Sequence, residues 1–319
     1  MDATPTVRAR GLRKSFGEVV ALDGVDLDVA EGQVHGLVGP NGAGKTTLLG
    51  LLLGLAAADG GTLEILGRPV GGPHALPDGV AGFVDGPGLY PSLTARQNLA
   101  ALASLRGTGA SGIAEALAQV GLTDVADDRV RGFSLGMRQR LGLSAALLTQ
   151  PRVLVLDEPA NGLDPAGTRH VHRVLSGLAA HGTSIIISSH RMDDLATLCD
   201  EVTVLATGRV VFTGPVETLA AQSAVLDYRL RTSDPVLARR TASDTPELRV
   251  LTGDQLTQRQ DADTLLVSGS VPALDELVTR LVRGGVSVRE LAPLVAPLEA
   301  AFLALTDADP ALSRAVILA

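Results

Sequence analysis

The segment Gly39-Pro40-Asn41-Gly42-Ala43-Gly44-Lys45-Thr46 has two glycines separated by four residues and followed by Lys and Thr. This is the pattern of a P-loop, a glycine-rich turn that connects a strand to a helix and holds phosphate groups. The apolar run Val34–Val38 precedes it and predicts a buried parallel strand, and Thr47–Leu55 follows it and predicts a helix. We therefore expect the core to be built outward from this strand, loop and helix.

The loop is suited to binding a polyphosphate. Glycines let backbone N–H groups approach the phosphates closely, and the helix that follows directs its N-terminus at them. Lys45 would reach the outer phosphates, and the Thr46 hydroxyl would be a ligand of Mg²⁺. The residues expected to bind the nucleotide phosphates are Gly39, Pro40, Asn41, Gly42, Ala43, Gly44, Lys45, Thr46 and Thr47.

A chance glycine-rich turn is the alternative, because the chain contains 36 glycines. The lysine content argues against it: Lys14 and Lys45 are the only lysines, whereas 25 residues are arginine. A chain that otherwise prefers arginine has lysine at the position where the pattern requires it.

The composition describes a globular protein larger than one typical domain. The chain has 319 residues, of which 45% are apolar and 19% charged, so it can bury a sizeable core. Its net charge of -8 argues against binding to nucleic acid. The single cysteine, Cys199, excludes a disulfide framework. No basic-then-apolar leader is present and no apolar run is long enough to span a bilayer, so we expect any membrane role to act through another polypeptide.

Two acidic residues follow a second buried strand. Val153–Leu156 is apolar throughout and leads directly to Asp157 and Glu158. The carboxyl ends of parallel strands meet at one edge of a sheet, so these acids are expected beside the P-loop. Asp157 is then placed to bind Mg²⁺, and Glu158 to orient and deprotonate an attacking water, a role worth about 10²–10⁴-fold in rate. The alternative is a solvated strand end, which the preceding apolar strand disfavours.

A third apolar run, Ser184–Ser188, ends next to His190. Strands alternate here with helical patterns such as Thr168–Ala180, which predicts a mostly parallel α/β core. Val202–Phe212 predicts a closing hairpin about Thr207-Gly208, and residues 215–222 a helical connector.

Near the start of the chain, Val7–Leu12 and Val19–Val29 alternate apolar and polar residues and predict antiparallel strands. Phe16 is expected in the turn between them. Its ring offers a flat face for an adenine, and base–aromatic stacking contributes about 1–3 kcal/mol. A packing role for Phe16 is the alternative.

A helical segment interrupts the strand-and-helix alternation. Apolar residues recur with helical spacing from Thr94 to Gly142, which predicts a helical subdomain inserted in the core. Ser134 is expected at the N-cap of a helix that runs to Thr149.

In chain order, five motifs resemble those of the ATP-binding cassette (ABC) ATPases. They are the P-loop, Phe133–Arg140, Val153–Glu158, Asn161-Gly162-Leu163-Asp164-Pro165 and Ser188-Ser189-His190. The resemblance implies an α/β fold: a P-loop NTPase core with a mostly parallel sheet, an antiparallel β subdomain, and a helical subdomain over about residues 86–150. It covers residues 1–218, the expected ATPase domain, and leaves residues 219–319 as a small C-terminal α/β accessory domain.

The resemblance also implies the ligands and the remaining roles. ATP and Mg²⁺ would be bound, with Thr46 and Asp157 as the magnesium ligands. Phe16 corresponds to the aromatic residue of the A-loop, and His190 to the switch histidine that contacts the γ-phosphate and acts in catalysis with Glu158.

A further set of residues would act on the nucleotide of a second copy. Ser134, Leu135, Gly136 and Met137 correspond to the signature motif that closes over the partner's ATP, and Asp164 to the D-loop acid across the dimer. A chain cannot fold its own signature onto its own P-loop. The resemblance therefore implies an ATP-dependent homodimer with two nucleotides between the subunits.

Two positions depart from the usual family pattern. Asp85 stands where the family usually has the Gln of the Q-loop, and a surface turn acid and a modified Q-loop are equally open. The signature reads Phe-Ser-Leu-Gly-Met in place of Leu-Ser-Gly-Gly-Gln, so it keeps Ser134 and Gly136 and loses one Gly and the Gln. These departures resemble the antibiotic- and multidrug-export ATPases.

The C-terminal hundred residues carry no catalytic constellation. Strands are expected at Val225–Arg231, Thr264–Ser268 and Val286–Leu291, with helices at Pro272–Arg283 and Leu294–Thr306. Asp234–Gln260 is polar and shows no strong period. This part resembles the regulatory or dimer-stabilising tail of drug-export ATPases, and a packing module is the alternative.

The resemblance implies an ATP-binding and ATP-hydrolysing subunit of an ABC exporter for a drug, antibiotic or peptide. It would work at the cytoplasmic face of the cell membrane through an integral membrane permease, with no nucleic acid as partner.

A soluble ABC-type ATPase of DNA repair or other remodelling is the alternative. Such proteins carry long heptad inserts, and only 89 positions without heptads separate Lys45 from Ser134. A translation factor would need two P-loops, and a partner-binding protein without ATPase activity would be expected to lack Lys45 or Glu158.

Overall fold

The computed structural model describes residues 5–73, 75–107, 109–222, 225–251 and 264–307. Among these residues the chain forms two compact units, one that extends to Val216 and also includes Thr306 and Asp307, and one that spans Glu217–Leu305. Each unit has its own hydrophobic core.

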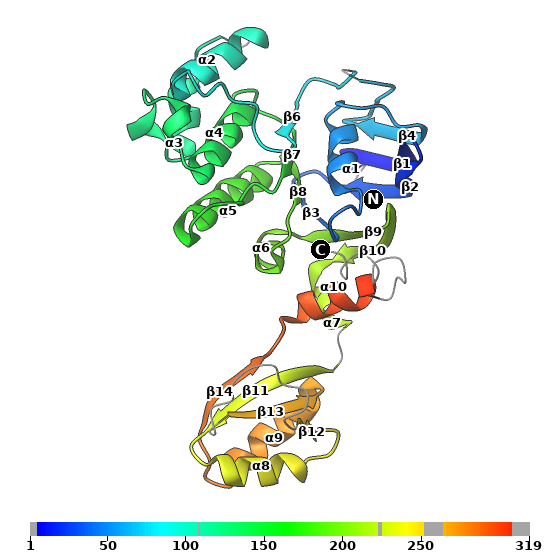
Figure 1. Cartoon of the computed structure of the whole chain (residues 1–319), viewed down its shortest axis with the longest axis vertical. Coiled ribbons are helices and arrows are strands. Elements are labelled where there is room, and N and C mark those ends of the chain that lie inside the picture. The colour runs from blue at the N-terminus through cyan, green and yellow to red at the C-terminus, as the bar shows by residue number, and fades with distance from the viewer. Residues whose placement is uncertain (1–4, 74, 108, 223–224, 252–263, 308–319) are drawn as a thin grey trace. The chain divides into compact units, whose positions relative to one another are not determined.

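The first unit contains a six-stranded sheet (Figure 1). In spatial order its strands are β10 (Arg209–Pro215), β9 (Glu201–Ala206), β3 (Val34–Val38), β8 (Ser184–Ser188), β7 (Val153–Asp157) and β6 (Val80–Phe83). Five of them run parallel, and β10 pairs antiparallel with β9. Every residue of β3, β7 and β8 is buried, which explains why these strands are apolar almost throughout. The predicted parallel α/β core is confirmed.

A second, antiparallel sheet covers the helix that follows the P-loop. Its order is β2 (Val19–Val29), β1 (Val7–Phe16), β4 (Gly60–Ile65) and β5 (Arg68–Pro69). The helix α1 (Lys45–Leu52) buries four leucines in the cluster that joins both sheets, and thereby fixes the P-loop between them.

The expectation that Phe16 lies in a turn is wrong. Phe16 is the last residue of β1 and pairs with Val19, so only Gly17 and Glu18 form the turn. The strand continues to Phe16 because β1 and β2 keep their pairing beyond the register shifts at Leu12–Arg13 and Lys14–Ser15.

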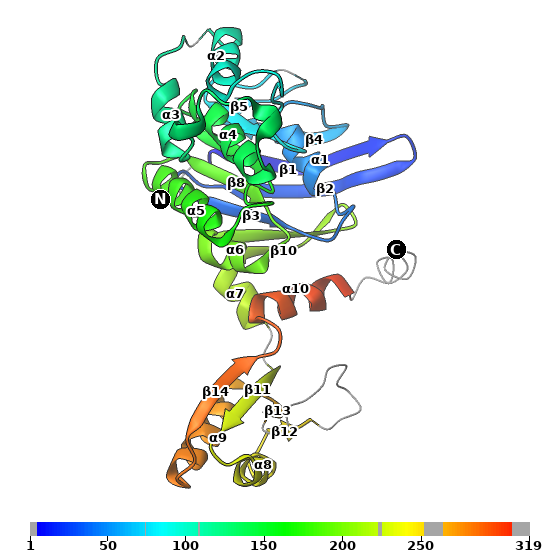
Figure 2. The ribbon, with the colours of Figure 1, turned by 60° about the vertical axis from the view of Figure 1, so that its left-hand side comes forward.

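Three helices form a lobe beside the sheets, as Figure 2 shows. They are α2 (Ala95–Leu105), α3 (Ile113–Gln119) and α4 (Leu135–Leu147), with short 3₁₀ turns η1 (Thr123–Val125) and η2 (Val130–Gly132) before α4. Thr94 caps α2 in a capping box with Gln97. Ser134 caps α4 by accepting the N–H of Met137 at 3.2 Å, as its position before an apolar run predicts.

Two further helices complete the first unit. Helix α5 (Pro165–Ala180) begins three residues before the predicted start, because Asp164 accepts the N–H of Gly167 at 2.7 Å and Pro165 fills the first helical position. Helix α6 (Met192–Leu198) was not expected, since seven residues are too few to show a helical period.

The second unit is an α/β sandwich with one four-stranded sheet. Its elements are α7 (Val216–Ala221), β11 (Leu226–Thr232), α8 (Pro235–Ser243), β12 (Arg249–Val250), β13 (Thr264–Gly269), α9 (Val271–Arg283), β14 (Val288–Pro293) and α10 (Pro297–Asp307). The strand order β12-β13-β11-β14, antiparallel throughout, is that of a ferredoxin-like β-α-β-β-α-β unit. The predicted C-terminal α/β fold is confirmed.

Two details of this unit differ from expectation. Helix α8 lies in the segment that showed no period, where Asp234 accepts the N–H of Leu237 at 2.9 Å and Pro235 opens the helix. Residues 252–260 of that segment lie outside the described part of the chain. Strand β14 starts two residues later than predicted, after the turn that brings the N–H of Val286 to the carbonyl of Leu281.

Within the described residues, every helix is too short or too polar to cross a membrane.

Candidate nucleotide site

The P-loop runs from the end of β3 to the start of α1 and is closely packed from both sides. A Cβ at Gly39 would lie 2.3 Å from the carbonyl oxygen of Leu205, and one at Gly44 would lie 2.4 Å from that of Ala21. Gly44 also has a φ of 102°, which favours glycine. Only glycine fits at these two positions, so the loop can lie against β9 and β2 with the N-terminus of α1 at its end.

Lys45 curls back over this loop. Its ammonium group donates to the carbonyls of Gly39 at 2.7 Å and Pro40 at 3.1 Å. Burial lowers the pKa of Lys45, whereas the nearby carboxylates of Glu158 and Asp157 act in the opposite direction. The cation of the P-loop is therefore held in place by the backbone that is expected to bind phosphate.

Asp157 lies across the sheet edge from the P-loop helix. Its Oδ2 accepts hydrogen bonds from the Thr46 hydroxyl at 3.5 Å and from the N–H of Asp85 at 3.3 Å. Hydroxyl and carboxylate oxygens are hard ligands of the kind Mg²⁺ prefers, so Thr46 and Asp157 fit the metal expected here.

Ser188 was not predicted as a site residue, yet it links the two acids. It occupies the position on β8 that pairs with Asp157 on β7. Its hydroxyl donates to Asp157 Oδ1 and accepts the N–H of Glu158 at 2.9 Å. The sequence signal was available: Ser188 is a polar residue at the end of a buried strand, next to the expected switch histidine.

Glu158 contacts His190 directly, with 2.7 Å between Glu158 Oε2 and His190 Nδ1. Glu158 adopts a φ of 50°, and its carbonyl accepts the N–H of Asn161 in a tight turn. Its side chain is 27% exposed, whereas Asp157 is 9% exposed as a residue. A carboxylate that reaches solvent beside a buried one can meet water that the buried one cannot.

Asp85 meets the site through its backbone. It has a φ of 57°, in the left-handed region that Asp and Asn tolerate better than most residues. The hydrogen bond to Asp157 comes from its N–H group. This backbone conformation is a physical reason for Asp rather than Gln at this position.

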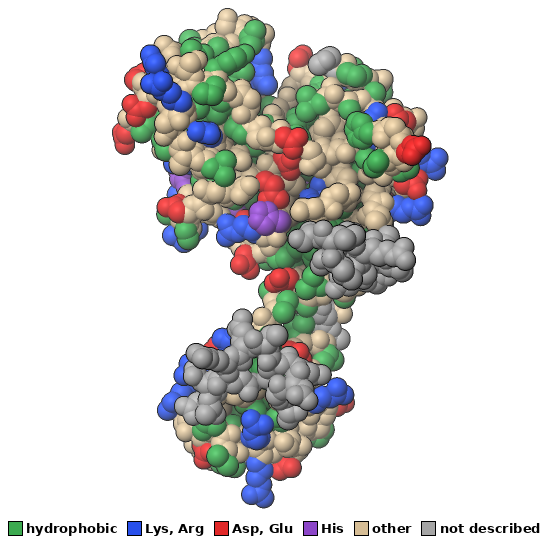
Figure 3. Space-filling model, in the orientation of Figure 1, with side chains coloured by type: hydrophobic (Ala, Val, Ile, Leu, Met, Phe, Trp, Pro, Cys, Tyr) green, Lys and Arg blue, Asp and Glu red, His purple; other side chains and the backbone are tan. Residues whose placement is uncertain are grey.

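A hollow of about 570 Å³ opens beside the two acids, between the strand ends and the helical lobe. Its lining residues are Asp85, Gly86, Pro87, Leu89, Pro91, Val130, Arg131, Leu135, Arg138, Gln139, Asp157, Glu158 and Asn161. In Figure 3, acidic side chains and a histidine gather between the helical lobe and the rest of the first unit.

The remaining signature residues lie in a different place. Ser134, Gly136, Met137 and Asp164 line a separate hollow of about 550 Å³. A Cβ at Gly136 would lie 2.7 Å from Leu163 Cδ2, so this glycine lets α4 pack against the segment before α5. The structure thus brings Ser134, Gly136, Met137 and the D-loop acid together in one hollow, whereas Leu135 lines the hollow beside Asp157 and Glu158.

Phe16 lies at the end of β1, an inner strand of the second sheet, and 56% of its surface is exposed. Its strand partners Val19 and Val20 are also exposed, at 67% and 57%. The next residue of β2, Ala21, is the one that contacts Gly44 of the P-loop. An exposed apolar surface therefore lies next to the phosphate loop, where a flat base can bind.

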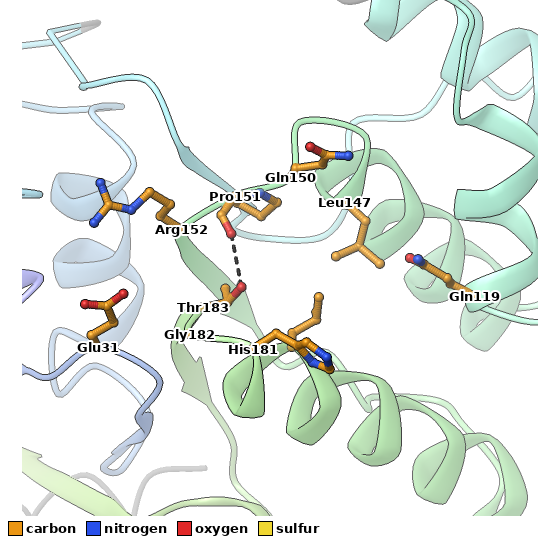
Figure 4. A pocket seen from close by; sticks show the side chains of 10 residues that line it. Glu31, Gln119, Leu147, Gln150, Pro151, Arg152, His181, Gly182 and Thr183 are labelled. Atoms are coloured by element: carbon orange, nitrogen blue, oxygen red, sulfur yellow. Dashed lines mark hydrogen bonds between the residues drawn. The ribbon is translucent and has the colours of Figure 1, made fainter.

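Another hollow, of about 360 Å³, lies at the opposite, N-terminal edge of β7 and β8 (Figure 4). In Figure 4 the hydrogen bond between the labelled residues joins Thr183 to the carbonyl of Pro151, at 3.2 Å. None of the predicted site residues lines this hollow. The predicted site residues that follow β7 and β8, Asp157, Glu158 and His190, lie instead at the carboxyl edge of the sheet.

Residues 22–161 match the family described as ABC transporter. The uncharacterized ABC transporter ATP-binding protein YdbJ of Bacillus subtilis is 32% identical, over 96% of this chain and 97% of its own length. The daunorubicin resistance ATP-binding protein DrrA3 of Streptomyces coeruleorubidus is 34% identical, over 96% of this chain and 98% of its own.

Two more likenesses concern the first unit. The bacitracin transport ATP-binding protein BcrA of Enterococcus faecalis is 39% identical, over 64% of this chain and 68% of its own length. A solved structure of the ATP-binding subunit of an ABC transporter has a TM-score of 0.62 at 26% identity, and covers 68% of this chain and 92% of its own.

Proposed function

The chain belongs to the ABC transporter family of ATP-binding proteins, and from this premise we propose that it hydrolyses ATP to drive an exporter of a drug, antibiotic or peptide. Relatives that match nearly the full chain or its first unit are named for daunorubicin resistance and bacitracin transport. The observation that carries the proposal is the cluster at the carboxyl edge of the sheet, where Lys45, Asp157 and the Glu158–His190 pair lie together.

The P-loop and the end of the β1–β2 hairpin bind ATP. Backbone N–H groups of residues 39–47 and the N-terminus of α1 hold the phosphates, and Lys45 leaves the carbonyls of Gly39 and Pro40 to neutralise the outer ones. The adenine stacks on Phe16, whose exposed ring belongs to the β1–β2 hairpin that contacts Gly44 through Ala21.

Thr46 and Asp157 are the residues that would hold Mg²⁺, and the metal would neutralise charge on the phosphate oxygens. Ser188 keeps Asp157 oriented by donating to its other oxygen. Because Asp157 is buried and hydrogen-bonded in this way, its carboxylate stays fixed at the edge of β7.

Glu158 acts as the general base. Its partly exposed carboxylate accepts the proton of the attacking water, and the backbone bond from Glu158 to Ser188 holds it in register with Asp157. His190 orients Glu158 through the 2.7 Å contact and lies where a γ-phosphate would be met.

The second set of residues acts on a neighbouring copy. Ser134, Leu135, Gly136 and Met137 open α4 and Asp164 opens α5, so two helix N-termini face outward from one hollow. A second copy in head-to-tail orientation places this surface over the P-loop of the first, so ATP binding makes the homodimer and hydrolysis releases it.

Within this function, residues 1–218 are the ATPase domain, with a helical subdomain over about residues 86–150, and residues 219–319 are an accessory domain. The partner is an integral membrane permease, which holds the chain at the cytoplasmic face of the membrane. Asp85 lines the hollow between the two acids and the helical lobe, and its N–H group donates to Asp157. Movement of the permease against the helical lobe can therefore be transmitted to Asp157 through this hydrogen bond. Nucleic acid is not a partner, because the chain carries a net charge of -8.

The test is a pull-down of the tagged chain from detergent-solubilised membranes, with ATP hydrolysis measured on the captured material. An integral membrane protein with several spanning segments, captured in near-equal amount, is the expected result. Capture of DNA-associated proteins alone, with ATPase activity that nucleic acid stimulates, would contradict export and favour a remodelling ATPase.

A further inference from the structure

Lys14 is one of two lysines in the chain, and the mechanism above gives it no role. It lies on β1 two residues before Phe16, and its side chain is only 14% exposed. Lysine side chains are usually solvated, so the burial of this one indicates that its ammonium group has an acidic partner.

That partner is Asp59, which forms hydrogen bonds with the last residues of β1. Asp59 Oδ1 accepts from Lys14 Nζ at 2.8 Å, and Oδ2 accepts the N–H of Ser15 at 2.7 Å. The N–H of Asp59 in turn donates to the carbonyl of Arg13 at 2.8 Å. The hydrogen bond from Lys14 lowers the pKa of Asp59, so this carboxylate stays charged at neutral pH.

Asp59 also ties this edge to the phosphate-binding helix. It lies in the short connection between α1, which ends at Leu52, and β4, which starts at Gly60. The contact between Asp59 and Lys14 therefore joins the P-loop helix to the strand that carries Phe16.

The ammonium group of Lys14 lies over the ring of Phe16, with Nζ 5.3 Å from the ring centroid. This is the geometry of a cation–π contact, which is favourable within about 6 Å. Lys14 lies over one side of the ring, and 56% of the surface of Phe16 is still exposed, so a ligand can reach this residue.

We propose that Lys14, held by Asp59, is a positioning residue for the adenine ring of ATP. The inference rests on the proposed function and adds a residue to its site. The cation orients Phe16 and draws π-electron density toward itself, which favours stacking of an electron-rich purine on the opposite face. The loss of this contact is expected to weaken ATP binding about two- to fivefold, the fold-change that corresponds to an exposed cation–π pair.

The experiment compares Lys14→Met with Lys14→Arg in the full-length chain. Equilibrium ATP affinity, KM and kcat are measured, together with inhibition by inorganic tripolyphosphate, which has the phosphates and no adenine. Lys14→Met is expected to raise the dissociation constant and KM for ATP about two- to fivefold and to leave kcat and tripolyphosphate inhibition unchanged. Lys14→Arg should restore the wild-type KM, because a guanidinium also binds over an aromatic ring.

Arg13→Met is the matched control, since Arg13 is the neighbouring cation, is 69% exposed, and faces Asp23 at 3.7 Å. It tests whether loss of any positive charge near the phosphates has the same effect. A second check is Phe16→Ala: in that background Lys14→Met should cause no further loss, because the ring through which it acts is gone.

Equal effects of Lys14→Met and Arg13→Met, a matching loss of tripolyphosphate inhibition, or a full additional loss in the Phe16→Ala background would overturn the inference. Those results leave the ATPase function intact. A wild-type chain that binds no ATP would overturn both.

Discussion

In the proposed function, two surfaces of the first unit each contribute half of a nucleotide site, and they are built differently. At the P-loop surface the reactive side chains contact one another: Asp157 meets Thr46 and Ser188, and Glu158 meets His190. At the signature surface, Ser134 and Asp164 instead cap the helices α4 and α5. We therefore expect the first surface to hydrolyse ATP, and the helix N-termini of the second surface to bind the nucleotide of another copy.

The largest effect is expected at the P-loop surface. Glu158→Gln removes the general base and keeps the size of the side chain, so kcat for ATP should fall about 10²–10⁴-fold while ATP still binds. Phosphate release and equilibrium binding measure the two quantities. Unchanged hydrolysis would show that Glu158 does not accept the proton.

Lys45→Ala should weaken ATP binding about 10–100-fold, because a charge-assisted contact to phosphate is lost. Isothermal titration measures it. Arg152→Ala is the control, a cation in the hollow at the opposite edge of the sheet. Equal losses from the two variants would mean that overall charge, and not the P-loop, governs binding.

The signature surface should respond in a different way. Ser134→Ala removes the cap of α4, at a cost of about 1 kcal/mol in stability, and should also abolish ATP-dependent association of two copies. Thr94→Ala removes the cap of α2 in the same helical lobe at a similar cost. Unfolding and sedimentation measurements on both variants separate the effects. If Thr94→Ala impairs association equally, Ser134 acts only as a cap.

The last effect is confined to acidic pH and concerns β3, the strand that leads into the P-loop. His35 on β3 is fully buried, its Nε2 lies 2.8 Å from Thr203 Oγ1, and burial lowers its pKa to about 4. Below pH 6.5 the imidazole of His35 binds a proton in the unfolded chain but not in the folded chain. The contribution of neutral His35 to the free energy of unfolding is therefore fully present above pH 6.5 and is lost as the pH falls toward 4. The loss by pH 5 is about 2 kcal/mol.

Urea unfolding at pH 7.5 and pH 5 measures this loss in the wild type and in His35→Gln, which cannot titrate in this range. The difference between the two pH values should be smaller in the variant by about 2 kcal/mol. An identical pH dependence would show that His35 does not remain neutral in the folded chain.

The strands of the core could be predicted because burial on both faces makes them continuously apolar. Val34–Val38 and Ser184–Ser188 have the predicted bounds for this reason. Short amphipathic elements could not be found in this way: α6 has seven residues, and α8 lies in a polar segment whose start is marked only by Asp234 and Pro235.

Residue placement within the site was predictable only in part. Spacing after a strand indicates that Asp157 and Glu158 reach the sheet edge, but it does not reveal that Ser188 joins them from the neighbouring strand, because strand order is not written in local sequence. The position of Lys14 over Phe16 likewise depends on the tertiary fold, because the connection after α1 brings Asp59 next to β1, where it binds Lys14.

The central claim is that the two surfaces meet across ATP, and the most direct test is the mass of the Glu158→Gln chain in solution with MgATP. We expect the mass to double from 32.7 kDa on addition of MgATP, and to stay at the monomer value when Ser134→Ala is added. A Glu158→Gln chain that binds MgATP and remains a monomer, or a dimer indifferent to Ser134, would contradict the account.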